Sequence, residues 1–166
     1  SELTQPLLDQ GELDLFIGPE GHITPDHPAE VLFEEEYVVV GWAKNPVFKH
    51  RSISEEDFYR AGHVVVEIGR QARTSFAEAH LLQSKRKRQI DMRVSSFLIA
   101  PEMVVNTMKL TVMHERLAKM YAKRLDIAIS PMPFEFPVMR EMIQYQQSRQ
   151  NDDGLRWLID QLKKSC

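Results

Sequence analysis

The chain has 166 residues, 43% of them apolar, which is enough for one domain or two small lobes with a buried core and too many for a disordered chain. Its 21 Lys and Arg against 24 Asp and Glu give a net charge of −3, which argues against a dedicated nucleic-acid-binding domain because such a domain presents a basic surface. The one cysteine, Cys166, can build neither a disulfide framework nor a cysteine-based zinc site.

Membrane and export signals are missing from the sequence. No apolar stretch approaches the roughly 18 residues of a membrane span, and the first residues lack the basic-then-apolar pattern of a signal peptide. The chain has no initiator Met and opens within a predicted helix, so we expect a fragment of a longer protein. A cytoplasmic location without membrane contact fits these features.

Apolar spacing predicts alternating helices and strands. In the first part of the chain we expect a helix carrying Leu3, Leu7 and Leu8, a strand at 13–17, and one long strand or two in series at 31–42. In the middle we expect a helix at 55–61, a strand at 63–68, a helix at 71–84, a strand at 90–94 and a helix after Ser95-Ser96. In the last part we expect a strand at 110–113, a helix at 114–123, a strand at 127–129, a segment at 138–146 that fits helix and strand equally, and a last helix from 151. Strands that alternate with helices of this length predict an α/β fold with a mostly parallel sheet.

Some of these segments carry more detailed expectations. The dense run 13–17 is typical of a strand buried on both faces. Ser54 with Asp57 resembles a helix capping box. In the helix 71–84 we expect Phe76, Ala79 and Leu82 to point inward, and Ser95-Ser96 to cap the helix that follows.

Catalytic and metal-binding motifs are hard to find. The seven glycines form no phosphate-binding loop, and His114-Glu115 is not followed by a second His four residues after His114, so it is no zincin motif. We expect no metal and no cofactor. The glutamates at 34–36 suggest paired carboxylates, but adjacent strand residues face opposite ways and a solvated edge is the better interpretation. The basic run 85–88 suggests either a nucleic-acid patch or, as we favour, a solvated turn.

Polar residues follow three of the predicted strands. In open α/β sheets ligands bind beyond the carboxyl ends of strands. This position singles out one set of candidates: Arg70, Thr74, Ser95, Ser96, Phe97 and His114. Arginine can bind a carboxylate with two hydrogen bonds, serine can donate or accept one, and a phenyl ring can stack on a ligand ring. Taken singly, each position is equally well explained by helix capping or by turn chemistry, so the convergence of three strand ends carries the hypothesis.

An ordered series of segments resembles the effector-binding domain of LysR-type transcriptional regulators. Residues 11–15 followed by 33–38 resemble the inner half of that domain. Further segments resemble its nodulation-regulator branch, which also holds regulators of aromatic degradation: these are 62–65, Phe76 with its helix, 95–97, 116–118 and 153–158. The resemblance covers the chain from about Leu8 to Leu162, and no single motif is diagnostic.

The resemblance implies a type 2 periplasmic-binding-protein-like fold, with two α/β lobes joined by two crossover strands and the N-terminal part of lobe one missing. We expect residues 1–39 to form part of lobe one, 40–127 lobe two, and 128–166 the return to lobe one with the C-terminal helix. Effectors of the family bind in the cleft between the lobes, so we expect Pro19 and Phe33 to lie across from the six candidates above.

Two departures from the family matter. Its winged helix-turn-helix domain is not in this sequence, so DNA contact is expected only through such a domain upstream. His114 stands where many relatives have Pro, which adds a titratable group to the expected site and could shift ligand preference.

Two classes of function remain open at this stage. The first is a ligand-sensing regulatory module that binds a small aromatic or organic acid, changes the geometry of a homodimer or homotetramer, and has DNA and RNA polymerase as partners of the full-length protein. The second is an enzyme that modifies a small molecule on a doubly wound sheet. The lack of a nucleophile–base pair, of metal ligands and of a phosphate loop favours the sensor.

Overall fold

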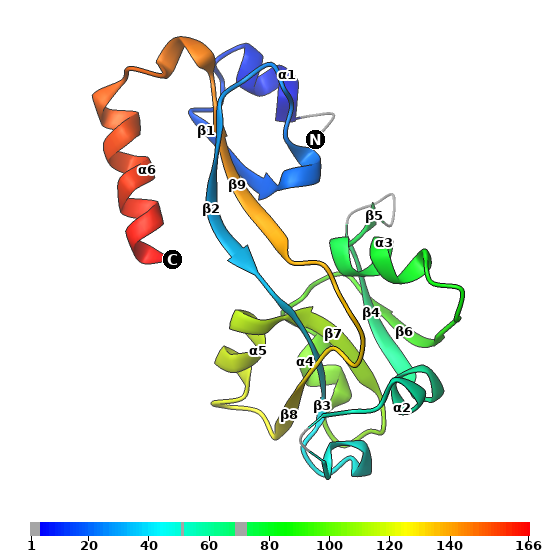
Figure 1. The fold of residues 1–166 in the computed structure, drawn as a ribbon. Helices are drawn as coiled ribbons and strands as arrows, with labels where there is room; N and C mark the ends of the chain where they lie inside the picture. The colour runs from blue at the N-terminus through cyan, green and yellow to red at the C-terminus, as the bar shows by residue number, and fades with distance from the viewer. Residues whose placement is uncertain (1–3, 51, 69–72) are drawn as a thin grey trace. The chain divides into compact units, whose positions relative to one another are not determined.

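The computed structural model describes residues 4–50, 52–68 and 73–166, and it divides into two units. Unit 1 combines residues up to Glu35 with Val138–Cys166, and unit 2 spans Glu36–Pro137. The chain therefore passes between the units twice, as the ribbon in Figure 1 shows. The units divide at 35/36 and 137/138, and the lobe boundaries expected from the resemblance, at 39/40 and 127/128, stay a prediction.

Unit 1 is a three-stranded antiparallel sheet with helices. Its strands lie in the order β1 (Leu15–Pro19), β9 (Met139–Tyr145) and β2 (Ala29–Glu35), so the segment that was ambiguous by sequence is the central strand. The other elements are helix α1 (Thr4–Asp9), the 3-10 turns η1 (Glu20–His22) and η3 (Gln147–Arg149), and helix α6 (Asp153–Ser165). Asp152 caps α6 by accepting the backbone N–H of Leu155 at 2.8 Å.

The core of unit 1 lies between its sheet and α6. Ile143 and Tyr145 of β9 pack against Leu155 and Ile159 of α6, which lie four residues apart on one helix face. Strand β1 contradicts the expectation of a fully buried parallel strand: it pairs antiparallel with β9, and Ile17 is 38% exposed. Within the part of the chain that the structure describes, β1 pairs on one side only.

Unit 2 holds the other helices and strands. In chain order they are β3 (Tyr37–Trp42), η2 (Pro46–Phe48), α2 (Glu55–Arg60), β4 (Gly62–Ile68), β5 (Arg73–Thr74), α3 (Phe76–Leu82), β6 (Gln89–Val94), α4 (Ala100–Val104), β7 (Leu110–His114), α5 (Glu115–Tyr121) and β8 (Ile127–Pro131). Of the two alternatives for residues 31–42, the structure has two strands in series, β2 and β3, which are separated at Glu36. No helix among the described residues is long and apolar enough to cross a membrane.

The sheet of unit 2 is mixed. Its main path runs β5-β4-β7-β3-β8, with β6 paired to β4 off that path. Strand β4 is parallel to β6 and β7, whereas β3 is antiparallel to both β7 and β8. The expectation of a mostly parallel sheet therefore holds for β6, β4 and β7 and is wrong for the other strands. The reason is that β3 and β8 are the ends of the two connections to unit 1 and form no βαβ unit of their own.

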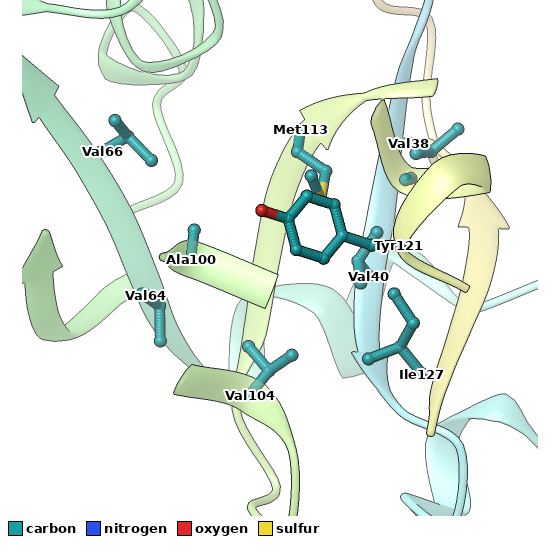
Figure 2. Close-up of a cluster of buried hydrophobic side chains, with 10 residues drawn as sticks. Val38, Val40, Val64, Val66, Ala100, Val104, Met113, Tyr121 and Ile127 are labelled. Atoms are coloured by element: carbon teal, nitrogen blue, oxygen red, sulfur yellow. The ribbon is translucent and has the colours of Figure 1, made fainter. Parts of the chain in front are cut away.

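Helices cover both faces of this sheet. On one face, Val38, Val40, Val64 and Val66 pack against residues of α4 and α5, with Met113 between them (Figure 2). The alternate residues of the same strands point to the other face. There His63 contacts Phe58 of α2, with ring centroids 4.7 Å apart. The candidate site described below is built on this second face.

Two helical predictions were wrong in detail. Helix α3 buries Ala77, Glu78 and Leu81, while Ala79 and Leu82, which we expected to point inward, are exposed. The cause is a buried ion pair: Glu78 turns inward to meet Arg88 at 2.7 Å, so a charged residue occupies the core-facing stripe. Helix α4 begins at Ala100 without a side-chain cap, and the Ser96 hydroxyl instead accepts the backbone N–H of Leu98 within the preceding turn.

Candidate functional site

The site is built around two paired residues at one edge of the unit 2 sheet. Tyr37 opens β3 and His114 closes β7, and the two lie opposite each other in the antiparallel register. The Tyr37 hydroxyl and His114 Nε2 are 3.1 Å apart and share a hydrogen bond, and their ring centroids are 4.9 Å apart. Strand pairing thus fixes the two side chains together.

Three phenyl rings surround this pair. Phe97 meets His114 edge-on at 4.7 Å, Phe76 stacks on Tyr37 at 5.7 Å with an interplanar angle of 12°, and Phe136 meets Tyr37 edge-on at 5.6 Å. We call these five residues, Tyr37, Phe76, Phe97, His114 and Phe136, the ring cluster. Such pairs are worth about 0.5–1.5 kcal/mol each beyond their buried area.

Local structure explains the positions of Tyr37, His114 and Phe76. Val38, Val40 and Met113 face the aliphatic core, so strand alternation turns Tyr37 and His114 to the other face. Ser75 caps α3 by accepting the backbone N–H of Glu78, which places Phe76 at the first position of the helix.

The electrostatics of the cluster favour a neutral imidazole. Burial lowers the pKa of His114 below its usual range, because desolvation penalises the charged form. A neutral imidazole and a phenol can each donate or accept a hydrogen bond, and the rings offer faces and edges for stacking. The cluster can therefore hold a planar molecule and bind one polar group of it.

The structure brings together part of the predicted site within unit 2. Phe97 and His114 are in contact, as expected from their places after β6 and at the end of β7. Ser96 is half-buried beside Phe97, and Ser95 is exposed. Thr74 is exposed on β5, two residues before the Phe76 ring that stacks on Tyr37. Arg70 lies outside the described residues.

Pro19 and Phe33 belong to unit 1. Pro19 ends β1 and Phe33 lies in β2, and both pair in register with Glu141 of the central strand β9. Burial, reinforced by the charge of nearby Glu35, raises the pKa of Glu141. That Pro19 and Phe33 face the residues of unit 2 stays a prediction.

Sequence reasoning missed Tyr37, Phe76 and Phe136 as members of the site. A signal for Phe136 was present in residues 133–137, where Phe134 and Phe136 stand two apart between prolines. In an extended segment that spacing puts both rings on one side. No comparable signal marked Tyr37, whose role follows from its pairing with His114.

Two charged motifs turn out to have structural roles. In the basic run 85–88, Arg86 binds Glu55 at 3.1 Å, and the side chain of Arg88 is only 5% exposed in its ion pair with Glu78. The solvated-turn interpretation is therefore wrong for Arg88. In the acidic triplet, Glu34 and Glu36 are exposed and Glu35 is buried, so the alternation is confirmed but the edge is not uniformly solvated.

Unit 2 is a mixed sheet with helices on both faces, entered and left through two connections, and it carries aromatic rings at its strand ends. The profile of the LysR substrate binding domain family matches residues 1–166, and the chain belongs to this family. The family is one of ligand-binding regulatory domains and not of enzymes, which sets aside the enzyme alternative.

Curated relatives include nodulation regulators. The chain is 33% identical over 153 residues to Nodulation protein D of Azorhizobium caulinodans, covering 92% of this chain and 48% of that protein. It is 30% identical over 158 residues to Nodulation protein D 1 of Bradyrhizobium diazoefficiens, covering 95% and 50%. The chain thus spans about half the length of the curated relatives it matches.

Solved structures confirm the fold expected from the resemblance. A probable transcriptional regulator from Pseudomonas aeruginosa matches with a TM-score of 0.83 at 22% identity, over 99% of this chain and 53% of that one. The reduced OxyR regulatory domain from the same organism matches with a TM-score of 0.78 at 19% identity, over 99% and 79%. The fold is therefore that of the type 2 periplasmic-binding-protein-like regulatory domains of LysR-type regulators.

Proposed function

We propose that this domain senses a small aromatic or organic acid through the ring cluster, together with Thr74, Ser95, Ser96 and, as the sequence suggests, Arg70. The observation that carries the proposal is the ring cluster itself, which gathers three phenyl rings around a hydrogen-bonded phenol and imidazole. Pro19 and Phe33 of unit 1 complete the proposed set. Hydroxyls at the strand ends can donate to a carboxylate, while the rings bind the flat part of the ligand.

The response to the ligand follows from the family. A ligand that binds one arrangement of the domain better than another shifts the population toward that arrangement. We propose that the shift alters the geometry of a homodimer or homotetramer and so the spacing of winged helix-turn-helix domains in the full-length protein. DNA, and RNA polymerase at the promoter, are the proposed macromolecular partners, and we propose the cytoplasm as the location because these partners are found there.

The assembly part of this proposal has its own test. Twofold isologous contacts are the commonest in such oligomers, and we propose for them the apolar helix faces around Phe76, Leu82 and Met103, where these exceed the needs of the core. Of these, Leu82 is 71% exposed, whereas Met103 packs against the core of unit 2. Light scattering of the full-length protein is expected to show at least a dimer. A monomer at every concentration contradicts the assembly proposal.

The sensing part is tested by a thermal-shift screen. The full-length protein is heated with a panel of small aromatic acids and, separately, with a broad panel of hydrolase substrates. We expect a subset of the acids to raise Tm without being consumed, since binding to the native state stabilises it by mass action. Turnover of a substrate, or a Tm that no acid changes, contradicts the proposal.

A further inference from the structure

A pocket of about 340 Å³ lies within unit 2 between α2 and α3. We call it the α2–α3 pocket. Residues from both helices, from the turn after α3 and from the segment that follows β8 line it: Glu55, Tyr59, His80, Leu81, Gln83, Ser84 and Phe134. It shares no residue with the ring cluster.

The interior of the α2–α3 pocket is apolar, and packing fixes the side chains that form it. Leu81 is buried on the core-facing stripe of α3. Phe134 stacks against Tyr59 at 5.9 Å with an interplanar angle of 23°, and its ring meets that of fully buried Phe58 edge-on at 5.3 Å. Because Phe58 anchors Phe134, the aromatic wall is preformed, which reduces the entropy lost on binding.

Hydrogen-bonding groups stand around this apolar interior. The Tyr59 hydroxyl and the Ser84 hydroxyl lie 3.0 Å apart and bond to each other, and either can be the donor. Gln83 adds an amide and His80 an imidazole to the lining. All four groups can both donate and accept, so they suit a polar group that does the same.

The charges at the pocket cancel locally. Glu55 is the one acidic residue of the lining, and Arg86 Nη1 donates to its carboxylate at 3.1 Å. The same guanidinium lies over the Tyr59 ring, 4.4 Å from the centroid. An anionic ligand would meet Glu55, and a cationic ligand would have to compete with Arg86 for both Glu55 and the ring. The pairing therefore favours a neutral ligand.

We propose that the α2–α3 pocket is a second small-molecule site, which takes a neutral single-ring aromatic compound bearing an amide or hydroxyl group. Its volume is at the low end of the roughly 300–1,000 Å³ of ligand pockets, which limits the ligand to about one ring and its substituent. The α2–α3 pocket adjoins the ring cluster, because His80 of its lining meets Phe136 edge-on at 4.8 Å, but it differs from the proposed effector site in its lining residues and in the charge of its ligand.

The test compares three probes of equal size and different charge: benzamide, benzoate and benzylamine. Each is titrated into the isotope-labelled protein, and amide shifts are followed by NMR. We expect benzamide to move the amide signals of Tyr59, Leu81 and Ser84, and to bind at least about tenfold more tightly there than either charged probe. Tighter binding of benzoate or benzylamine at these residues, or no shift with benzamide up to its solubility, overturns the proposal.

A matched pair of variants locates the binding. Gln83→Trp places an indole at the lining, whereas Ala79→Trp places one elsewhere on α3, at a residue that is exposed and not part of the lining. The first is expected to weaken benzamide binding at least about tenfold and the second to leave it unchanged. Equal affinity in both variants overturns the proposal.

A variant of the ring cluster separates the two proposals. Phe97→Leu alters the effector site and should leave the benzamide shifts at α2 and α3 intact. Loss of those shifts in Phe97→Leu would show that benzamide binds the ring cluster. It would overturn the proposed α2–α3 site and leave the proposed effector site unaffected.

Discussion

His63 is a buried titratable residue with both ring nitrogens engaged. Its Nε2 donates to the backbone carbonyl of Phe58 at 2.8 Å, since a carbonyl can only accept. Nδ1 is then the unprotonated nitrogen, and Arg88 Nη1 approaches it at 3.5 Å. Burial lowers the pKa of His63 to about 4, and the nearby Arg88 guanidinium acts in the same direction.

This depressed pKa predicts acid destabilisation of unit 2. Between pH 6.5 and about 4 the unfolded chain binds a proton at His63 that the folded chain does not, so stability falls as the pH falls through that window. At pH 5 the loss from this residue is about 2 kcal/mol relative to pH 7. Urea unfolding at the two pH values measures it.

The His63→Gln variant is the control, because its amide can still donate to the Phe58 carbonyl but does not titrate. We expect its stability to depend less on pH by about the same 2 kcal/mol. An unchanged pH dependence in this variant would show that other groups cause the acid loss.

Gly41 marks a close approach inside the sheet of unit 2. It lies in β3 directly opposite Leu110 of β7, and an added Cβ would come within 2.9 Å of Leu110 Cδ2 and 2.6 Å of the Phe48 ring. Leu110 is fully buried, so it has little room to move.

Replacement of Gly41 by Ala is therefore expected to destabilise the protein by about 1–3 kcal/mol, as overpacked cores do. Gly21→Ala is the matched control, since an added Cβ there meets nothing within 4 Å. Chemical denaturation of both variants is the measurement, and equal stabilities would contradict the close packing at Gly41.

At the scale of elements, α6 is held to the sheet of unit 1 by one carboxylate. Glu30 of β2 accepts hydrogen bonds from Arg156 Nη1, from Lys163 Nζ at 2.7 Å and from the Tyr145 hydroxyl at 3.0 Å. Chiefly through Arg156, these donors lower the pKa of Glu30 to about 2, although partial burial opposes them. The network joins β2, β9 and α6.

Two neighbouring lysines allow a controlled test of this network. Lys163→Gln removes the bond to Glu30, while Lys164→Gln changes an exposed residue one position further along α6. We expect the first to speed hydrogen exchange of the α6 amides by an amount that corresponds to about 0.5–1 kcal/mol, because the pair is partly exposed, and the second to have no effect. Equal exchange in the two variants would contradict the role of Glu30.

Elements were predictable from sequence where local chemistry decides them. The N-cap of α2 formed at Ser54 as expected: its hydroxyl accepts the backbone N–H of Asp57 at 3.0 Å and donates to the Asp57 carboxylate at 2.6 Å. The continuous valine runs of β3 and β4 predicted strands buried on both faces, and all six valines are buried. What failed depended on distant partners: the face of α3 is set by the Glu78–Arg88 pair, and the antiparallel pairing of β1 is set by β9, more than a hundred residues later.

The residues of the candidate site differ in the same way: some are marked by local sequence signals, and others depend on distant partners. Phe97 and His114, which contact each other in the candidate site, could be predicted because they lie at or just beyond strand ends, and strand ends can be located in one sequence. Tyr37 could not be found in this way, since it stands at the start of its strand and joins the site only through antiparallel pairing with β7.

At the scale of the whole molecule, the free edge of β1 predicts a further strand. Its apolar residues Leu15, Phe16 and Ile17 lie on an edge that, among the described residues, has no partner. Unpaired apolar edges invite aggregation. We expect the 166 residues expressed alone to aggregate more readily than the full-length protein, as measured by size-exclusion chromatography. Equal solubility of the two would contradict a missing strand at this edge.

The central claim is that the ring cluster is the effector site of unit 2. Its most direct test is a ligand titration of the full-length protein with the acid that raises Tm most in the screen. Isothermal titration calorimetry compares the parent protein with Phe97→Leu, which keeps apolar bulk but removes the ring beside His114, and with Phe48→Leu, which removes a ring of unit 2 outside the cluster. We predict that Phe97→Leu weakens binding by at least about fivefold, the loss of one aromatic contact, and that Phe48→Leu leaves the affinity unchanged. Unchanged affinity in Phe97→Leu, or an equal loss in both variants, would contradict the assignment.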